Sequence, residues 1–494
     1  MFLASCPGIA ALARGVLGNL TLPAFAPTAA SPGGALWDDP EPERAAILRG
    51  GPILTMDDAQ PVGEALAIRG STILGVGSLT EVKRHYTPGT EIIDLAGHAV
   101  LPGFVEPHVH VLESALVAAG LATDAAAELC EQEPERVAEL GARALREFAM
   151  RGCTTVYDAG IGQLAGAAEH RLLGALARAP GAPVRVRGAF TPELATTLGE
   201  APGAGDEHYD VVGISYRADG SIEDFAAALG EPYLNGRPGA TLAHEEAELR
   251  EALRVWRDAG WQLVVHAEGD RATEQVLRCF EALLGDRSAA MPLPVRAGEL
   301  PPMGGGAGAA AGVRGLARDD GSPMLHRIER FAVVRDEQIA RAAALGLSVS
   351  HAINQVYYLG EVFRDQLLGR ERAAHIHSLR RDLEHGVVSS CHSDAPAAPA
   401  DPCLALRTAT TRLMRDSDDV LGPFQQLTLD EALRTLTVNP ARQVLLGDRV
   451  GALRPGMLAD LVVLDRDPRE VAPERLHELR VVETWLGGRR QRWG

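Results

Sequence analysis

Short apolar strands alternate with helical stretches through most of this 494-residue chain, and this alternation limits the fold more than any other feature. One stretch, Glu245–Ala259, has the apolar spacing of an amphipathic helix and leads into a strand that ends in histidine. Over residues 101–445 the repeated strand–helix units favour an α/β fold, specifically a TIM-like (β/α)8 barrel. The later strands are predicted at Cys153–Asp158, Pro183–Phe190, Asp210–Tyr216, Trp261–His266, Ala332–Val334, Leu347–His351 and Val387–His392.

The two ends of the chain have a different texture, with short aliphatic and β-branched runs separated by glycines. These runs lie at Ala46–Met56, Ala65–Gly77 and Glu91–Leu95, and again between Gly451 and Trp493. Such spacing is typical of hairpins in a small sheet. The pattern predicts β-structure at both ends, although periodicity alone does not join the two halves.

Composition narrows the class of protein and of partner. Hydrophobic residues make up 46% of the chain and charged residues 23%, which is ordinary for a globular protein. The net charge of −18 argues against nucleic acid as a partner and leaves a small-molecule substrate as the expected one. No apolar run reaches the roughly 18 residues of a membrane helix, so we expect no membrane partner. A homo-oligomer is compatible with the sequence.

Two segments depart from the regular pattern. Residues 1–45 are rich in Ala, Leu, Gly and Pro, and Ala24–Ala26 resembles a cleavage site, but only Arg14 supplies the basic residue of a signal. We interpret this stretch as a leader, either disordered or a degraded export signal. The expected location is therefore cytoplasmic, with export as the alternative. Residues 286–323, around Gly304–Gly306, predict a flexible insertion in the barrel, either a surface loop or a lid.

The run Leu101–His110 places two histidines one residue apart at the end of a short apolar strand. Residues i and i+2 of a strand point to the same face, so His108 and His110 can aim two imidazoles at one point. Neutral imidazole is the commonest protein ligand of a divalent metal. The tripeptide alone also arises by chance, and the metal interpretation depends on what accompanies it.

Three other blocks accompany this run in the chain. They are Val265–Ala272 (VHAEGDRA), His392–Pro396 (HSDAP) and Gly451–Asp465 near the C-terminus. Together with LPGFVEPHVH they resemble the motifs of the amidohydrolase superfamily, in the branch of N-substituted formamide deformylase-like proteins, also called amidohydrolase family 3. The resemblance runs from about Ile47 to the end. It implies a metal-dependent barrel over 101–445 and one β-sandwich domain built from 46–100 plus 446–494.

The resemblance also implies a catalytic divalent metal, with Zn²⁺ expected first and Fe²⁺ or Mn²⁺ as alternatives. It assigns four ligands to one ion: His108, His110, His266 and Asp394. Each falls where an apolar strand ends, which is where barrel enzymes carry their chemistry. Asp394 is also the expected catalytic general base, which takes a proton from water and passes it to the leaving nitrogen. Outside its block, Asp394 would be interpreted as a helix cap or turn residue.

Four further residues are predicted to contact substrate or to support the ligands. Glu106, just before the histidine pair, is expected to orient an imidazole. Glu268 would face the site if its strand continues, and is otherwise a solvated loop carboxylate. Arg330 is expected to bind a substrate carboxylate or an oxyanion, or else to form a structural salt bridge. Tyr357 is a candidate for part of the pocket wall.

Three positions depart from the family pattern. Ser215 stands where relatives carry a lysine that bridges two metals, and Arg330 stands where they carry a ligating histidine. Gln355 replaces a histidine of close relatives. Serine cannot bridge two metals in that way, and arginine is a permanent cation and a poor ligand. We therefore expect one metal ion instead of two.

These observations predict a metal-dependent hydrolase of carbon–nitrogen bonds other than peptide bonds, such as an amide, formamide, carbamate or cyclic amide. Metal-activated water would be the nucleophile. One alternative is a mononuclear-metal deaminase acting on a heterocycle. A second alternative is a non-catalytic relative that binds a small molecule, in which Ser215 and Arg330 mark a decayed metal site.

Overall fold

The computed structural model describes residues 45–285, 324–417 and 419–493. Within these ranges the strands form two separate sheets, one parallel and one mixed. The predicted leader, apart from its last residue, and the predicted insertion at 286–323 lie outside the described residues.

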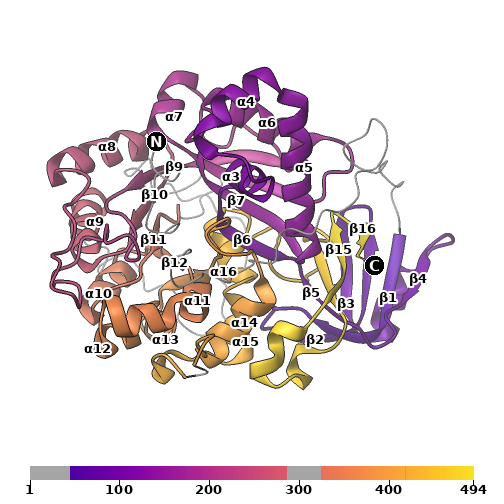
Figure 1. Cartoon of the computed structure of the whole chain (residues 1–494). Coiled ribbons are helices and arrows are strands. Elements are labelled where there is room, and N and C mark those ends of the chain that lie inside the picture. Colours follow the sequence, from indigo (N-terminus) through magenta and orange to yellow (C-terminus); the bar gives the residue numbers. More distant parts are fainter. Residues whose placement is uncertain (1–44, 286–323, 418, 494) are drawn as a thin grey trace.

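The parallel sheet is the barrel predicted from the sequence (Figure 1). Its eight strands in the described chain follow one another in sequence order around the sheet. They are β6 (Phe104–Val109), β7 (Cys153–Ile161), β8 (Arg185–Phe190), β9 (Tyr209–Arg217), β10 (Gln262–Ala267), β11 (Arg327–Arg330), β12 (Ser348–His351) and β13 (Val388–Cys391).

Backbone hydrogen bonds just beyond the first and last strands close the barrel. The His110 N–H donates to the Ala395 carbonyl at 2.9 Å, and the Asp394 N–H donates to the His108 carbonyl at 3.2 Å. The seam between β6 and β13 thus lies where the predicted ligands are. The fold expectation of a (β/α)8 barrel is confirmed.

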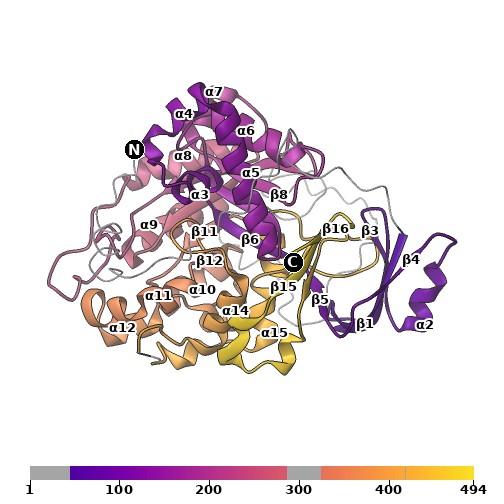
Figure 2. The same cartoon turned by 45° about the vertical axis from the view of Figure 1, so that its right-hand side comes forward.

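Helices surround the barrel, as the two views in Figures 1 and 2 show. The predicted amphipathic helix is present as α8 (Glu246–Asp258), which buries Leu249 and Leu253. The others are α3 (Val111–Ala118), α4 (Ala126–Gln132), α5 (Pro134–Met150), α6 (Ala167–Arg178), α7 (Pro192–Leu198), α9 (Asp270–Leu284), α10 (Asp336–Ala344), α11 (Asn354–Val362), α12 (Arg370–His375), α13 (Leu379–Glu384), α14 (Pro402–Thr411), α15 (Leu429–Arg434) and α16 (Val438–Gln443). A π-helical turn, Phe363–Leu367, continues α11.

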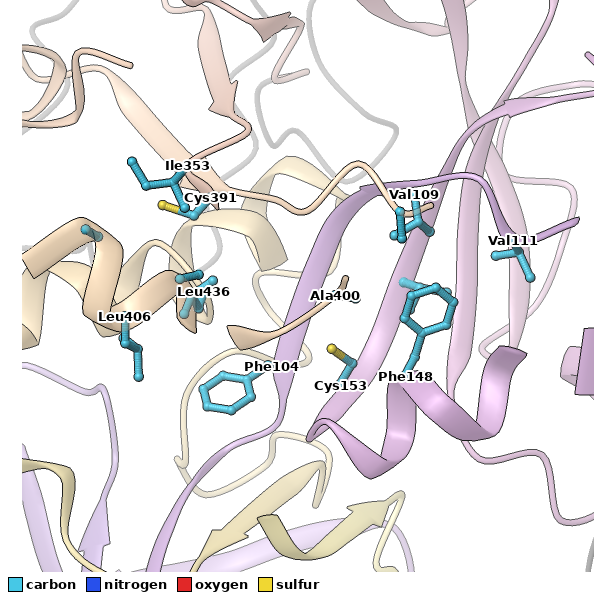
Figure 3. Close-up of a cluster of buried hydrophobic side chains, with 14 of the residues drawn as sticks. Phe104, Val109, Val111, Phe148, Cys153, Ile353, Cys391, Ala400, Leu406 and Leu436 are labelled. Atoms are coloured by element: carbon cyan, nitrogen blue, oxygen red, sulfur yellow. The ribbon is translucent and has the colours of Figure 1, made fainter. Parts of the chain in front are cut away.

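The core around the seam draws on distant parts of the chain. Figure 3 shows Phe104 of β6, Phe148 of α5 and Cys153 of β7 on one side, and Cys391 of β13 and Leu406 of α14 on the other. All five are buried. This packing holds the first and last barrel strands together beneath the loops that carry the ligands.

One predicted strand is wrong in position. The sequence pattern predicted Ala332–Val334, whereas the sixth barrel strand is Arg327–Arg330. Its sequence, RIER, has three charged residues out of four, so an apolar pattern does not reveal it. The charges are tolerated inside because they pair with one another and with neighbouring strands.

The mixed sheet joins the two ends of the chain. Its order is β16-β15-β14-β5-β1-β2-β3, with β4 paired to β1. The strands are β1 (Ala45–Leu54), β2 (Val62–Arg69), β3 (Thr72–Gly77), β4 (Glu91–Asp94), β5 (Ala99–Pro102), β14 (Leu461–Leu464), β15 (Val481–Leu486) and β16 (Arg489–Arg492), and the short helix α2 (Leu79–Val82) lies in the same part of the chain. The antiparallel pair β5–β14 unites the N-terminal and C-terminal strands.

This terminal sheet lies beside the barrel in both views, with its indigo and yellow strands next to one another (Figures 1 and 2). A buried ion pair connects the two parts: Asp460, just before β14, accepts hydrogen bonds from Nε and Nη2 of Arg185 at the start of β8, at 3.0 and 3.1 Å. Both side chains are inaccessible to solvent. In the described part of the chain, no helix is both long and apolar enough to cross a membrane.

Candidate metal centre

Two histidines at the end of β6 begin the site. His108 lies within the strand, and His110 directly precedes α3. Asp158, near the end of the neighbouring strand β7, accepts hydrogen bonds from the backbone N–H groups of Val111 and Gly160, at 2.8 and 3.1 Å. This carboxylate therefore fixes the start of α3 and, with it, the position of His110.

The two imidazoles meet at one carboxylate oxygen. Oδ1 of Asp394 lies 3.1 Å from Nε2 of His108 and 3.6 Å from Nε2 of His110. Donor atoms that share one metal ion are separated by such distances, since each metal–ligand bond is about 2 Å long. Asp394 has a φ of 57°, in the left-handed region that aspartate tolerates better than most residues. That backbone conformation turns its side chain back toward the end of β6.

His108 is fixed from behind by a buried carboxylate that the sequence interpretation did not identify. Nδ1 of His108 lies 3.0 Å from Oε2 of Glu329 in β11, and Glu329 also contacts Arg327 and Ser350. Burial opposes a charged imidazole, but the negative charges of Glu329 and Asp394 outweigh it and raise the pKa of His108 to about 9. A carboxylate on Nδ1 leaves Nε2 directed at the ligand position, as is usual for metal-binding histidines.

Arg330 occupies the other side of Asp394. Its Nη2 donates a hydrogen bond to Oδ2 of Asp394, and its Nη1 lies 3.8 Å from Oε1 of Glu268. Burial alone would raise the pKa of Asp394, but Arg330 and His108 hold it well below its usual range. Asp394 is thus a carboxylate anion with one oxygen on a guanidinium and the other facing two imidazoles.

His266 lies at the end of β10, and the structure does not bring it into this group. The set of donor atoms within 4.8 Å of one another contains His108, His110 and Asp394. Nδ1 of His266 lies 3.5 Å from Oδ1 of Asp219, which is itself anchored by the Glu268 backbone N–H at 2.9 Å. Burial and the charge of Arg217 lower the pKa of His266 to about 4, so its imidazole is neutral.

Glu106 supports the loop that carries Asp394. Its Oε1 accepts a hydrogen bond from the Ser393 backbone N–H at 3.1 Å. Burial raises the pKa of Glu106 to about 8, against the effect of that hydrogen bond. Glu268 is also buried, and its Oε2 accepts a hydrogen bond from the Ile222 N–H at 3.1 Å.

The remaining residues singled out in the sequence contact groups other than the three donors at Asp394. The Tyr357 ring packs under the guanidinium of Arg407 on α14, with 5.1 Å from the guanidinium carbon to the ring centroid. Gln355 bridges Glu223 and His377 through hydrogen bonds of 3.1 and 3.2 Å. Ser215 is half-buried in β9.

A second set of donors lies behind the first. His392 stacks on His108 with 4.7 Å between ring centroids, and Glu329 completes the set. Glu329 is already committed to Arg327, Ser350 and His108. These partners occupy both oxygens of Glu329, whereas Oδ1 of Asp394 faces the two imidazoles, so the group at Asp394 fits a metal better.

The sequence interpretation missed Glu329, Asp158 and Asp219, which hold His108, the start of α3 and His266 in place. A signal was present for two of them, because Asp158 and Asp219 are acidic residues at or just after the end of a predicted strand. Glu329 lies in the charged strand that the apolar pattern did not reveal. The donors at Asp394, two imidazoles and one carboxylate, are those that zinc, iron and manganese accept.

Comparisons with known proteins relate this chain to one family and one fold. The model of an amidohydrolase family matches residues 114–491. An N-substituted formamide deformylase of Arthrobacter pascens is 32% identical over 173 residues, which cover 35% of this chain and 32% of that protein. YtcJ of Bacillus subtilis, provisionally described as an amidohydrolase, is 26% identical over 278 residues, 55% of this chain and 45% of its own. The chain thus spans less than half the length of these relatives.

Among solved structures, an uncharacterised metal-dependent hydrolase from Pyrococcus horikoshii has a TM-score of 0.69 at 19% identity. The match covers 87% of this chain and 99% of that one. At this level of identity the likeness shows a shared fold.

Proposed function

Because the chain belongs to the amidohydrolase family, we propose that it is a metal-dependent hydrolase that cleaves a carbon–nitrogen bond other than a peptide bond. Amides, formamides, carbamates and cyclic amides form the proposed substrate class. The observation that carries the proposal is the meeting of His108 Nε2 and His110 Nε2 at one oxygen of Asp394, at the carboxyl end of the barrel strands. That end is where barrel enzymes place their active sites.

One divalent ion, Zn²⁺ in the first place, would be held by His108, His110 and Asp394, with His266 as the further predicted ligand. When bound, such an ion acidifies a water molecule so that hydroxide is available at neutral pH. The protein side chains perform the remaining work. Glu329 keeps the Nε2 atom of His108 directed at the site, and Arg330 holds Asp394 as an anion in a fixed orientation.

Asp394 is the proposed general base and acid. Its carboxylate faces both imidazoles, so it can accept a proton from water at the point where a carbonyl carbon would be attacked. The same carboxyl group then delivers that proton to the leaving nitrogen, whose departure as a neutral amine completes the hydrolysis. The hydrogen bond from Arg330 prevents the carboxylate from turning away between the two proton transfers.

Metal analysis of the purified protein tests the proposal, with wild type compared to Asp394→Asn. About one zinc ion per wild-type chain is expected, with strong loss in the variant, because the amide cannot supply a charged ligand. Asp258→Asn, at an exposed position of α8, is the matched control and should keep the metal. About two ions per chain would contradict the single-metal arrangement. No bound metal and no activation by Zn²⁺ or Mn²⁺ would favour the non-catalytic alternative.

A product assay then distinguishes the reactions. The name of the Arthrobacter relative supports formamides as the first compounds to try, followed by carbamates and cyclic amides. Release of an acid together with an amine is the expected outcome. Ammonia released from a heterocycle, without a carboxylic acid, would instead support the deaminase alternative.

A further inference from the structure

Arg217 is an exposed cation at the mouth of the barrel that the proposed mechanism does not use. It is the last residue of β9, and its ladder partner on β10 is His266. Residues in register on neighbouring parallel strands point to the same face of the sheet. Arg217 therefore faces the same side as the histidine at the site.

The outward neighbour of Arg217 supports this orientation. The Tyr216 hydroxyl accepts a hydrogen bond of 3.0 Å from Nε1 of Trp256, which lies on the surrounding helix α8. Since successive residues of a strand alternate between faces, Tyr216 points out and both Ser215 and Arg217 point into the barrel. The inward cation is thus two residues beyond Ser215, toward the open end.

The positive charge of Arg217 influences three titratable groups on different elements. It lowers the pKa of His110, of His266 and of Glu113, although burial is the largest influence on all three. Glu113 lies on α3, and the negative charge of Asp394 raises its pKa. Arg217 therefore lies near Glu113 and near the two histidines, in addition to its register with His266.

Three of the carboxylates near these histidines already have other partners. Asp394 pairs with Arg330, and Asp158 and Asp219 accept backbone hydrogen bonds. Burial, with the charges of Asp394 and Asp158, raises the pKa of Glu113 to about 7, so at neutral pH it carries only part of a negative charge. Within the described residues, no hydrogen bond or ion pair holds the side chain of Arg217.

We propose that Arg217 binds a carboxylate of the substrate, so that the hydrolysed compound is an amide or formamide that also carries one carboxylate group. This inference rests on the proposed function for the bond that is cleaved. A guanidinium recognises a carboxylate through two parallel hydrogen bonds, which suits an exposed arginine at a site entrance. Arg217, whose side chain has no partner among the described residues, matches one negative charge, and a second anionic group would face Glu113 and Asp394.

Two matched pairs of probes test the proposal. Formate release is measured from 4-(formamidomethyl)benzoate and from the neutral 4-(formamidomethyl)benzamide. Binding is measured by calorimetry with 4-(hydroxymethyl)benzoate and 4-(hydroxymethyl)benzamide, which contain no formamide bond. The proteins are metal-loaded wild type, Arg217→Gln, Arg217→Lys and Arg143→Gln, an exposed arginine of α5 that serves as control.

We expect wild type and Arg143→Gln to prefer the carboxylate of each pair about tenfold, which corresponds to roughly 1.4 kcal/mol. Arg217→Gln should lose most of that preference through a higher KM for the carboxylate, and Arg217→Lys should retain part of it. Added salt should reduce the preference, since the contact is exposed.

Equal affinities of wild type for the benzoate and the benzamide, or no binding of the benzoate, would overturn the role of Arg217. So would an unchanged preference in Arg217→Gln. If wild type releases formate from neither formamide, formamide hydrolysis fails while calorimetry still decides the carboxylate contact. The two proposals are thus tested separately.

Discussion

At the scale of the residue, one carboxylate organises the site. Asp394 contacts two imidazoles through one oxygen and a guanidinium through the other. Arg330 and Asp394 both have left-handed backbone conformations, with φ of 73° and 57°. Such conformations are costly for residues other than glycine and persist where the surroundings impose them. The backbone thus directs these two side chains at one another across the barrel mouth.

The separation of His266 from the donor group leads to a graded prediction. His110→Ala should remove most of the bound metal, since Nε2 of His110 lies 3.6 Å from Oδ1 of Asp394. His266→Ala should weaken metal affinity less, because this imidazole contacts Asp219 and lies outside the group of three donors. Zinc titration with a competing chelator measures both. Equal losses in the two variants would show that His266 is a full ligand.

At the scale of the element, a buried glutamate holds the turn between β7 and α6. One oxygen of Glu169 accepts hydrogen bonds from the backbone N–H groups of Gly162, Leu164 and Ala165, at 3.0 to 3.2 Å. Burial and the charge of Asp158 raise the pKa of Glu169 to about 8, against the effect of these donors. Because Asp158 also fixes the start of α3, this turn and the candidate metal centre share one acidic neighbour.

This raised pKa predicts a pH-dependent difference in stability. The pKa of Glu169 in the folded protein, about 8, exceeds its ordinary value of 4.5. The contribution of the Glu169 carboxyl group to the free energy of unfolding is therefore complete below pH 4.5 and is lost as the pH rises through 8. Glutamine does not titrate. Between pH 5 and pH 9 the free energy of unfolding of Glu169→Gln should therefore rise by roughly 2–4 kcal/mol relative to that of wild type.

Urea unfolding of both proteins across this pH range measures the difference. Glu139→Gln, on the exposed face of α5, is the matched control. A difference between Glu169→Gln and wild type that stays constant with pH would show that Glu169 is ionised throughout.

At the scale of the whole molecule, the barrel and the terminal sheet are connected through Asp460. Besides the two hydrogen bonds from Arg185, its Oδ1 accepts one from the Gly487 N–H at 2.7 Å, and its carbonyl accepts one from the Gly103 N–H at 2.9 Å. Gly103 directly precedes β6, the strand of the two histidines. The terminal sheet thus contributes to where the first barrel strand begins.

Removing the Asp460 carboxylate should lower the stability of the whole protein. Asp460→Ala leaves the fully buried guanidinium of Arg185 without its main partner, and the free energy of unfolding should fall by about 3–5 kcal/mol. Asp258→Ala breaks an exposed ion pair with Arg254 and should cost no more than about 1 kcal/mol. Chemical unfolding followed by circular dichroism measures both. Similar losses in the two variants would contradict the role of Asp460.

Local patterns determined a large part of this protein. The alternation of strands and helices predicted the barrel, and the structure confirms it. The family resemblance predicted His108, His110 and Asp394 as ligands; the structure brings their side chains together, and their role as ligands stays a prediction. The prediction of the fold succeeded because side-chain direction along a strand and the parallel order of strands depend on short-range regularities.

Only the tertiary structure decided what surrounds the ligands. Glu329, which holds His108, lies 221 positions later in a strand too charged for an apolar pattern to reveal. The ion pair of Arg330 with Asp394, the absence of His266 from the group of three donors and the position of Arg217 beside His266 likewise depend on neighbours far apart in sequence. Electrostatic partnership is a property of distance in space, and no local spacing in the chain encodes it.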